Sequence, residues 1–338
     1  MKLPSIIFLV FGLFSLSALG QTYDPLFLIK QNGRVGYIDR TGKVVIEPQF
    51  DDGWYFSEGL ACVTVKGKTG FIDTSGIIVI KPQFNSLYGC YEEFREGLAP
   101  ISMGSRELIK GQWVDNSKWG FVDKNGKVMI LPGVSFVSKF REGLAFFHKD
   151  GLTGYFDRNL SIVIKPQFKS AGSFYEGRAR ATDVDGTEYY IDKTGRRLFR
   201  NNDGGEVQDS AAFFEIDGKY GFIDLDGKVI VEPQFSSATH FGEGLAGVKV
   251  GDKWGFIDKK GKLIIPPTFD NVGDFSEGLV SVELKGKWGF ADHDGKIVIP
   301  PQFDKWSYFF DNGLCRVHVG DQTGYIDKAG KWIWPLSN

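Results

Sequence analysis

Five arginines lie close together in one segment of this sequence and are the first side chains to consider for binding chemistry. They are Arg178, Arg180, Arg196, Arg197 and Arg200. Guanidinium groups donate paired N–H bonds to planar anions, so this cluster could hold a phosphate, a sulfate or a uronate. The alternative is a solvated surface, since exposed ion pairs are common and weak. The carboxylates that would neutralise such a surface are Asp183, Asp185, Glu188 and Asp203.

Aspartates recur along the whole chain and invite a metal hypothesis. They end nine short aromatic motifs, as Asp39, Asp73, Asp123, Asp157, Asp192, Asp224, Asp258, Asp292 and Asp327. A ladder of carboxylates suggests calcium, but each motif brings one carboxylate and calcium takes six to eight oxygen ligands. Aspartate also accepts a hydrogen bond from the backbone two residues later, which makes a tight turn. The sequence therefore predicts turns at these positions, with no metal site and no cofactor.

Residues typical of catalysis are scattered. The four histidines lack the spacing of a zinc motif, and neither a nucleophile elbow nor a phosphate-binding loop is present. Two carboxylates from different parts of the chain could still meet in space, which keeps a glycan-acting hydrolase as the enzymatic alternative. We expect no catalytic activity and assign no catalytic residue.

The nine aromatic motifs reveal a tandem repeat that must position all of these residues. The motifs read VGYID, TGFID, WGFVD, TGYFD, EYYID, YGFID, WGFID, WGFAD and TGYID. The residue three positions before the aspartate is Gly36 in the first motif and Gly324 in the last. From one motif to the next, this residue recurs after 34, 50, 34, 35, 32, 34, 34 and 35 residues. Such a regular period indicates one supersecondary unit copied along the chain.

Two further motifs keep their spacing to the first. An apolar run closed by proline and phenylalanine follows it, as in VVIEPQF (44–50) and IVIPPQF (297–303), and a Glu-Gly-Leu triplet precedes the next unit, as at Glu58–Leu60 and Glu277–Leu279. A unit with these three motifs resembles the WG (KWG) repeat family of bacterial proteins, over essentially the whole mature chain. The resemblance implies a repeat scaffold and does not tie the protein to one reaction or ligand.

Each unit has the pattern of about three β-strands and almost no helix. In KWGFIDKKGK (253–262), Trp254 and Phe256 alternate with Gly255 and Ile257, which is the period of a strand. Asp258 to Gly261 forms a hairpin turn, and the prolines of LIIPP end the next strand. The glycine between large aromatics suggests that one unit's ring packs over the bare backbone of its neighbour.

The assembly of the units allows two architectures. A closed β-propeller usually has four strands per blade and a longer repeat, and both ends of this chain carry a complete set of strands. We therefore expect an all-β open superhelix of about nine three-stranded units across residues 21–338, with a closed propeller as the alternative.

Two interruptions of the repeat are places where a binding site could be added to the scaffold. An insertion at residues 101–117 predicts a projecting hairpin with its turn at Gly104–Glu107, although a tolerated loop is the simpler interpretation. The second is a degenerate unit at residues 178–211, where Tyr189 replaces the motif glycine and Arg178 replaces the triplet leucine.

The N-terminus predicts export. Lys2 is followed by an uncharged apolar segment and by Ala18-Leu19-Gly20, so residues 1–20 read as a signal peptide cleaved near Gly20. We expect an extracytoplasmic protein, periplasmic or at the cell surface, without a transmembrane segment. Cys62, Cys90 and Cys315 are interpreted as small buried residues, with a Cys62–Cys90 disulfide as the alternative.

The sequence thus predicts an exported scaffold that binds an unknown protein or envelope component. The formal net charge of −2 does not favour nucleic acid. The alternative is a carbohydrate-binding or carbohydrate-acting secreted protein, suggested by aromatic residues in KWSYFF (305–310) and by Trp332 and Trp334. The same residues could instead belong to the core or cap the array.

Overall fold

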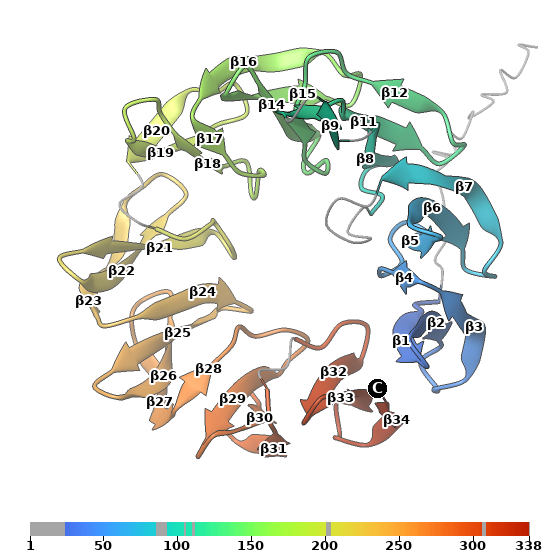
Figure 1. The fold of residues 1–338 in the computed structure, drawn as a ribbon. Helices are drawn as coiled ribbons and strands as arrows, with labels where there is room; N and C mark the ends of the chain where they lie inside the picture. Colours follow the sequence, from blue (N-terminus) through green and yellow to red (C-terminus); the bar gives the residue numbers. More distant parts are fainter. Residues whose placement is uncertain are drawn as a thin grey trace, which may run out of the picture.

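The protein is a ring of nine small antiparallel sheets, which is a nine-bladed β-propeller-like arrangement (Figure 1). The computed structural model describes residues 24–85, 93–104, 106–109, 112–200, 204–305 and 309–337, and the predicted signal peptide lies outside them. Every regular element in these ranges is a strand. The expected all-β repeat is therefore confirmed, but the preferred open superhelix is wrong and the propeller alternative is correct.

Four blades contain three strands each. They are blade 1 with β1 (Phe27–Gln31), β2 (Arg34–Ile38) and β3 (Val44–Phe50); blade 3 with β8 (Leu98–Met103), β11 (Lys118–Asp123) and β12 (Val128–Ile130); blade 6 with β21 (Ala211–Ile216), β22 (Lys219–Asp224) and β23 (Val229–Phe235); and blade 9 with β32 (Leu314–Val319), β33 (Gln322–Asp327) and β34 (Trp332–Ser337).

The other five blades have a fourth strand of two to five residues at the inner edge, which is too short to show a periodic pattern in the sequence. They are blade 2 with β4 (Asp52–Gly53), β5 (Leu60–Val65), β6 (Lys68–Asp73) and β7 (Ile78–Asn85); blade 4 with β13 (Phe136–Val137), β14 (Leu144–Lys149), β15 (Leu152–Asp157) and β16 (Ile162–Phe168); blade 5 with β17 (Ser170–Ala171), β18 (Ala179–Thr182), β19 (Glu188–Ile191) and β20 (Arg197–Arg200); blade 7 with β24 (Ala238–Gly242), β25 (Leu245–Val250), β26 (Lys253–Asp258) and β27 (Leu263–Phe269); and blade 8 with β28 (Asn271–Val272), β29 (Val280–Leu284), β30 (Lys287–Ala291) and β31 (Ile297–Phe303).

Within a blade the chain runs from the centre of the ring outward. The strand after the Glu-Gly-Leu triplet pairs with the strand of the aromatic motif, and the proline-containing strand pairs on the outer side, as in β25, β26 and β27. Figure 1 shows strands such as β3, β7, β16, β23 and β31 at the outside of the ring. We call these outermost strands the outer rim.

A bulge in the proline strand explains the glycine of the aromatic motif. In blade 7, Trp254 pairs with Phe269 but Phe256 pairs with Ile265, so two extra residues loop out of the outer strand. A Cβ atom added to Gly255 would lie 2.5 Å from the carbonyl oxygen of Ile265. The glycine is therefore required by the outer strand of its own blade, and the predicted packing of a neighbour's ring over it is wrong.

Blade 5 supports the same relation, because it has neither the bulge nor the glycine. Its outer strand lacks the proline bulge, and Tyr189 and Tyr190 pair directly with Arg200 and Phe199. Without bulged backbone above it, the position of the glycine has room for the Tyr189 side chain. The two departures that the sequence shows in this unit are therefore one structural change.

The apolar core is divided into nine clusters, and each cluster is built from two consecutive blades. The aromatic residue directly after the glycine of each motif packs against an aromatic of the next blade in most of them. Phe256 of blade 7 meets Phe275 of blade 8 at a centroid distance of 5.1 Å, and Phe71 of blade 2 meets Phe94 of blade 3 at 4.9 Å. The blades are thus held by large apolar contacts between neighbours.

Blade 9 closes the ring on blade 1 with the same kind of contact. Phe27 and Tyr325 lie 5.6 Å apart edge to face, and the Tyr325 hydroxyl donates a 2.8 Å hydrogen bond to the Leu28 carbonyl. Tyr37 of blade 1 makes the equivalent 2.8 Å bond to Trp54 of blade 2. Among the described residues, each terminal blade is made from its own segment of the chain, as the sequence predicted.

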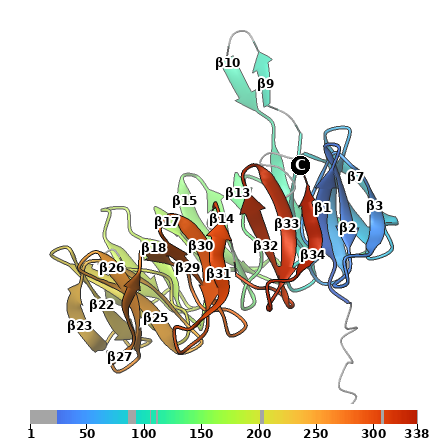
Figure 2. The same cartoon turned by 90° about the horizontal axis from the view of Figure 1, so that it is seen from below.

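The insertion forms a separate hairpin of β9 (Arg106–Ile109) and β10 (Gln112–Asp115), which projects from one face of the ring (Figure 2). The projecting hairpin is as expected, but Gly104–Glu107 is not its turn, because Arg106 and Glu107 already pair with Asp115 and Val114. The reason is that Gly104 lies where β8 gives way to the hairpin, and the hairpin continues for four residues on each side.

We predict that Gly255→Ala strongly destabilises the protein, because its new methyl group would overlap backbone that cannot move without breaking the bulge. The loss in unfolding free energy should be about 3 kcal/mol or more. Gly172→Ala is the matched control, since a Cβ there meets its nearest atom at 3.9 Å. Thermal or urea unfolding of both variants measures the difference, and equal stability would contradict this role of the bulge.

Candidate functional site

The nine aspartates of the aromatic motifs have the predicted turn role. Each accepts two backbone N–H bonds within its own turn, from the residues two and four positions later; in blade 7, Asp258 accepts 2.9 Å bonds from Lys260 and Lys262. Within the described ranges, no three residues among His, Cys, Asp and Glu gather as metal ligands would.

The glutamates of the Glu-Gly-Leu triplets have a role that the sequence did not reveal. Ser57 and Leu60 exchange two backbone hydrogen bonds around Glu58 and Gly59, both with positive φ (53° and 85°), which makes a tight hairpin turn. Positive φ is unfavourable for glutamate and points to a role for its side chain. That side chain reaches into the next blade, where it accepts the backbone N–H of Gly97 at 3.0 Å.

This contact, which we call the triplet latch, recurs at seven consecutive interfaces. The acceptor and donor residues are Glu58 and Gly97, Glu96 and Gly143, Glu142 and Gly177, Glu176 and Ser210, Asp209 and Gly244, Glu243 and Gly278, and Glu277 and Gly313, at 2.7–3.1 Å. At the seam between blades 9 and 1, Asn312 replaces the glutamate and Pro25, which has no N–H, replaces the glycine. The seam is therefore held without a triplet latch.

A cation from the next blade completes most latches. Lys124 lies 3.0 Å from the Glu58 carboxylate, and Lys193 and Lys328 take the same place at Glu142 and Glu277. Partial burial alone would raise the pKa of these glutamates, but the lysine ammonium and the backbone N–H outweigh it and lower the pKa. The latch is thus a charge-assisted contact between blades.

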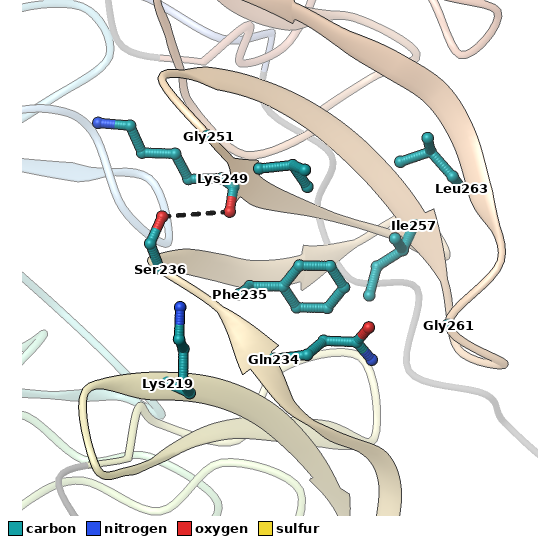
Figure 3. Close-up of a pocket in the computed structure, with 10 residues that line it drawn as sticks. Lys219, Gln234, Phe235, Ser236, Lys249, Gly251, Ile257, Gly261 and Leu263 are labelled. Atoms are coloured by element: carbon teal, nitrogen blue, oxygen red, sulfur yellow. Dashed lines mark hydrogen bonds between the residues drawn. The ribbon is translucent and has the colours of Figure 1, made fainter.

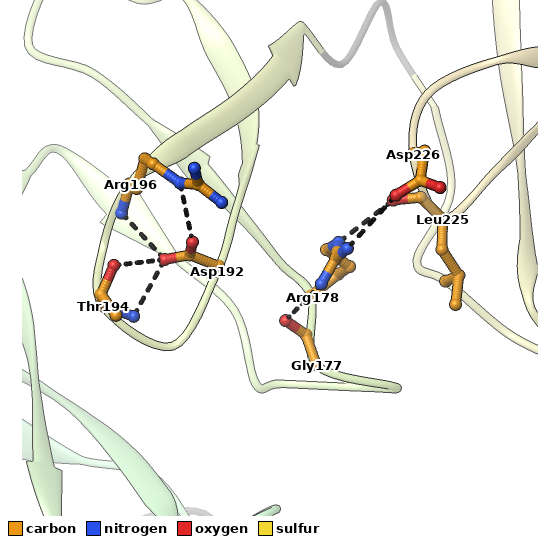
Figure 4. Close-up of polar contacts among 7 residues, drawn as sticks. All are labelled: Gly177, Arg178, Asp192, Thr194, Arg196, Leu225 and Asp226. Carbon is orange, nitrogen blue, oxygen red and sulfur yellow. Dashed lines mark hydrogen bonds and ion pairs between the residues drawn. The ribbon is translucent and has the colours of Figure 1, made fainter.

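Arg178 makes a different contact across the interface of blades 5 and 6. Here Leu225 stands where other blades have the lysine, and Arg178 comes from the opposite side of the interface (Figure 4). Its guanidinium donates to the Leu225 carbonyl at 3.1 Å and lies 3.8 Å from the Asp226 carboxylate. Arg178 thus links blade 5 to the turn of blade 6, which gives a structural role to the arginine that replaces the triplet leucine.

The structure brings three of the five predicted arginines together. Arg178, Arg196 and Arg197 line a small cavity of about 190 Å³ with Phe199 and Leu225. Arg196 lies 3.0 Å from Asp192 in its own turn, and Figure 4 shows it bent toward that carboxylate.

Arg197 makes a two-point contact with Asp183 at 2.8 and 2.5 Å, which raises the pKa of the guanidinium. The other two arginines lie outside the cavity. Arg180 pairs with Glu188 at 2.9 Å on the neighbouring strand, and Arg200 is exposed at the end of β20. Anion binding by this cluster stays a prediction, with carboxylates already facing four of its guanidiniums.

The cysteines differ from one another. Cys315 is fully buried, and burial raises the pKa of its thiol to about 12, as expected for a small core residue. Cys62 is disulfide-bonded, so the interpretation as a buried thiol is wrong for this residue. Cys90, its partner in the alternative that the sequence left open, lies outside the described residues.

Comparison with known families decides the relationship of the chain. A family model described as "WG containing repeat" matches residues 36–68, 70–106, 119–152, 154–186, 220–254, 254–288 and 288–321. This chain belongs to the WG-repeat family. The WG-repeat matches skip residues 187–219, which contain the aromatic motif and outer strand of blade 5, and so agree with the degenerate unit seen in the sequence.

The similarity of this chain to other solved structures concerns only its fold. No curated protein matches the chain. A solved structure described as "Crystal structure of the eukaryotic initiation factor" is similar with 10% identity and a TM-score of 0.63, covering 94% of this chain and 98% of that one. A computationally designed protein, Ika8, is similar with 11% identity and a TM-score of 0.50, covering 92% and 98%. No helix in the described part of the WG-repeat chain has the length and apolar character that crossing a membrane requires.

We predict that acid weakens the ring through the triplet latches. The pKa values of Glu58, Glu142 and Glu277 are lowered in the folded state, so the stabilisation from these three latches is complete above the ordinary value of 4.5 and is lost as the pH falls through the lower folded value. Glu142→Gln should cost about 1 kcal/mol at pH 7 and reduce the acid dependence. Unfolding between pH 7 and pH 3 measures both effects, and the exposed Glu47→Gln is the control. An identical pH profile for Glu142→Gln and the native protein would contradict the latch.

We also predict that Arg197 is mainly structural while Arg200 is not. Arg197→Ser removes the two-point contact to Asp183 and should lower stability by about 1 kcal/mol, since the pair is only partly buried. Arg200→Ser should leave the melting temperature unchanged. Retention of the native protein and of an Arg178→Ser/Arg196→Ser variant on a sulfated matrix tests anion binding separately, and equal retention would rule it out at the cavity.

Proposed function

We propose that this protein is a non-catalytic scaffold, exported from the cytoplasm by residues 1–20, that binds another protein of the cell envelope along the outer rim of its ring. The observation that supports this proposal is a series of exposed aliphatic side chains on the outermost strands or, for Ile77, directly before one. They are Val45, Ile77, Ile78, Val79, Ile162, Val163, Val229, Leu263, Ile264 and Val298.

The rim of blade 2 has the strongest features of a contact surface. Ile77 is 64% exposed, and Ile78 and Val79 are each 45% exposed, in one continuous stretch. Adjacent exposed aliphatic residues on a soluble protein commonly mark an interaction site. The outer edge of β7 also has no neighbouring strand in its sheet, so its backbone groups face outward beside these side chains. Aliphatic side chains beside an open strand edge suit a protein partner better than a sugar.

Carbohydrate binding is the second candidate, supported by Trp332 on β34. Its indole is 40% exposed and lies edge to face with Phe303 at a centroid distance of 6.3 Å, so one face could stack on a sugar ring. Phe309 is 59% exposed, whereas Phe310 is buried and Trp334 packs at the seam between blades 9 and 1. Of the aromatic stretch 305–310, residues 306–308 lie outside the described residues.

The test is an affinity capture from an envelope extract with a rim variant. Ile77→Thr/Val79→Thr keeps β-branched side chains and removes the exposed aliphatic surface, and should reduce recovery of the partner at least tenfold without changing the melting temperature. Val184→Thr is the matched control, because Val184 is 71% exposed between β18 and β19 of blade 5. Unchanged recovery by the rim variant would contradict the proposal. Binding on a glycan array that Trp332→Ala abolishes would instead support the carbohydrate candidate.

A further inference from the structure

Three blades contain an ion pair that also ties them to the next blade. The basic residue that opens the aromatic-motif strand pairs with an aspartate 17 residues later, in Arg34–Asp51, Lys253–Asp270 and Lys287–Asp304. The second oxygen of each aspartate accepts a backbone N–H from the first hairpin of the next blade, with Lys66, Lys285 and Gly320 as donors at 2.6–2.7 Å. Each carboxylate thus has an ammonium or guanidinium on one side and an N–H on the other.

Blade 6 keeps the cation but not the carboxylate. Lys219 opens the aromatic-motif strand, and the residue 17 positions later is Ser236. The Ser236 hydroxyl donates to the Lys249 carbonyl at 3.2 Å. Figure 3 shows the Lys219 side chain pointing toward Ser236. Among the residues that the structure describes, no carboxylate lies within ion-pairing distance of Lys219.

The backbone donor of the next blade is also in place. Gly251 in the first hairpin of blade 7 corresponds to Lys285 in blade 8 and Gly320 in blade 9. All three have positive φ, of 60°, 54° and 60°, so this part of the hairpin has the same conformation in the three blades. Lys219 and the Gly251 N–H therefore present the donor pair that holds an aspartate elsewhere.

These groups lie in the wall of a pocket between blades 6 and 7 with a volume of about 330 Å³. Lys249 of blade 7 also lines the pocket, and Figure 3 shows its carbonyl oxygen facing Ser236 and its ammonium turned away from the apolar side. The apolar part of the lining comes from Phe235, Ile257 and Leu263 (Figure 3). A pocket of this size with an apolar wall and a few polar groups is at the lower limit for a small organic ligand.

We propose that this pocket binds a small organic carboxylate, whose carboxyl group takes the place that Asp51, Asp270 and Asp304 have at other interfaces. The carboxylate accepts hydrogen bonds from the Lys219 ammonium and the Gly251 N–H. The apolar body of the ligand lies against Phe235, Ile257 and Leu263. The proposal is independent of the rim of blade 2, which lies across the ring (Figure 1).

The interface of blades 3 and 4 offers an internal comparison. Lys118 and Ser135 occupy the positions of Lys219 and Ser236, but His148 replaces Lys249. Burial lowers the pKa of His148, so this imidazole is neutral at pH 7 and adds no charge. The interface of blades 6 and 7 therefore carries the greater positive charge of the two.

The experiment measures binding of 3-phenylpropionate to the full chain by calorimetry. 3-Phenyl-1-propanol tests the need for the carboxylate, and glucuronate and inorganic phosphate test the apolar wall and the kind of anion. We expect 3-phenylpropionate to bind at least tenfold more tightly than each of the other three. Absence of 3-phenylpropionate binding would overturn the proposal, equal affinity for the alcohol or phosphate would overturn carboxylate recognition, and equal affinity for glucuronate would overturn the apolar contact.

Variants locate the site. Ser236→Asp restores the aspartate of the other blades, so it should raise the melting temperature and weaken binding at least tenfold, because its own carboxylate occupies the donors. Lys219→Met should weaken binding to the same extent. Ser236→Ala, and Lys253→Met at the next interface, should bind within about threefold of the native protein. Native affinity in Ser236→Asp would overturn the proposal, since the donor pair would then not be the binding site.

Discussion

The structure depends on burial of apolar side chains between consecutive blades. Each core cluster takes residues from two blades, so no blade has a core of its own. An open array would leave the apolar faces of its first and last blades in water, including Phe27 and Tyr325, which are buried against each other at the seam. Closure removes both exposed faces, which is a physical reason for the ring.

Polar contacts align each blade with the next, in addition to this apolar packing. The triplet latch places a carboxylate on the backbone of the next blade, and it does so from a glutamate whose own backbone is in an unfavourable conformation. An unusual residue in one unit is often in contact with a second unusual feature. Arg178, which replaces the triplet leucine, contacts Leu225, and Tyr189, which replaces the motif glycine, lies in the blade whose outer strand lacks the proline bulge. The pair of Lys219 and Ser236 has no such compensation, which is why we assign a ligand to it.

The sequence was sufficient for features that are local. Strand period, the turn at each motif aspartate and the repeat boundaries depend on residues a few positions apart. Closure of the ring was not predictable, because it depends on the small rotation of each blade relative to the next, and no single residue in the sequence indicates the size of that rotation. The role of Glu58 was hidden because the backbone N–H that its carboxylate accepts belongs to Gly97, 39 residues later in the chain. The role of Gly255 was misread because an outer-strand bulge, not a neighbouring blade, fills the space above it. The missing carboxylate at Ser236 was visible in principle, since Asp51, Asp270 and Asp304 repeat at the same spacing.

The central claim, that blade 9 packs on blade 1 as any blade packs on the next, can be measured directly. Thr41, Ser75 and Ala329 are exposed and occupy the same turn position in blades 1, 2 and 9. Spin labels at Thr41 and Ala329 should show by pulsed electron resonance the same short, narrow distance distribution as labels at Thr41 and Ser75, which report a pair of blades consecutive in the chain. A much longer distance for the first pair would mean that the array is open and would contradict the ring.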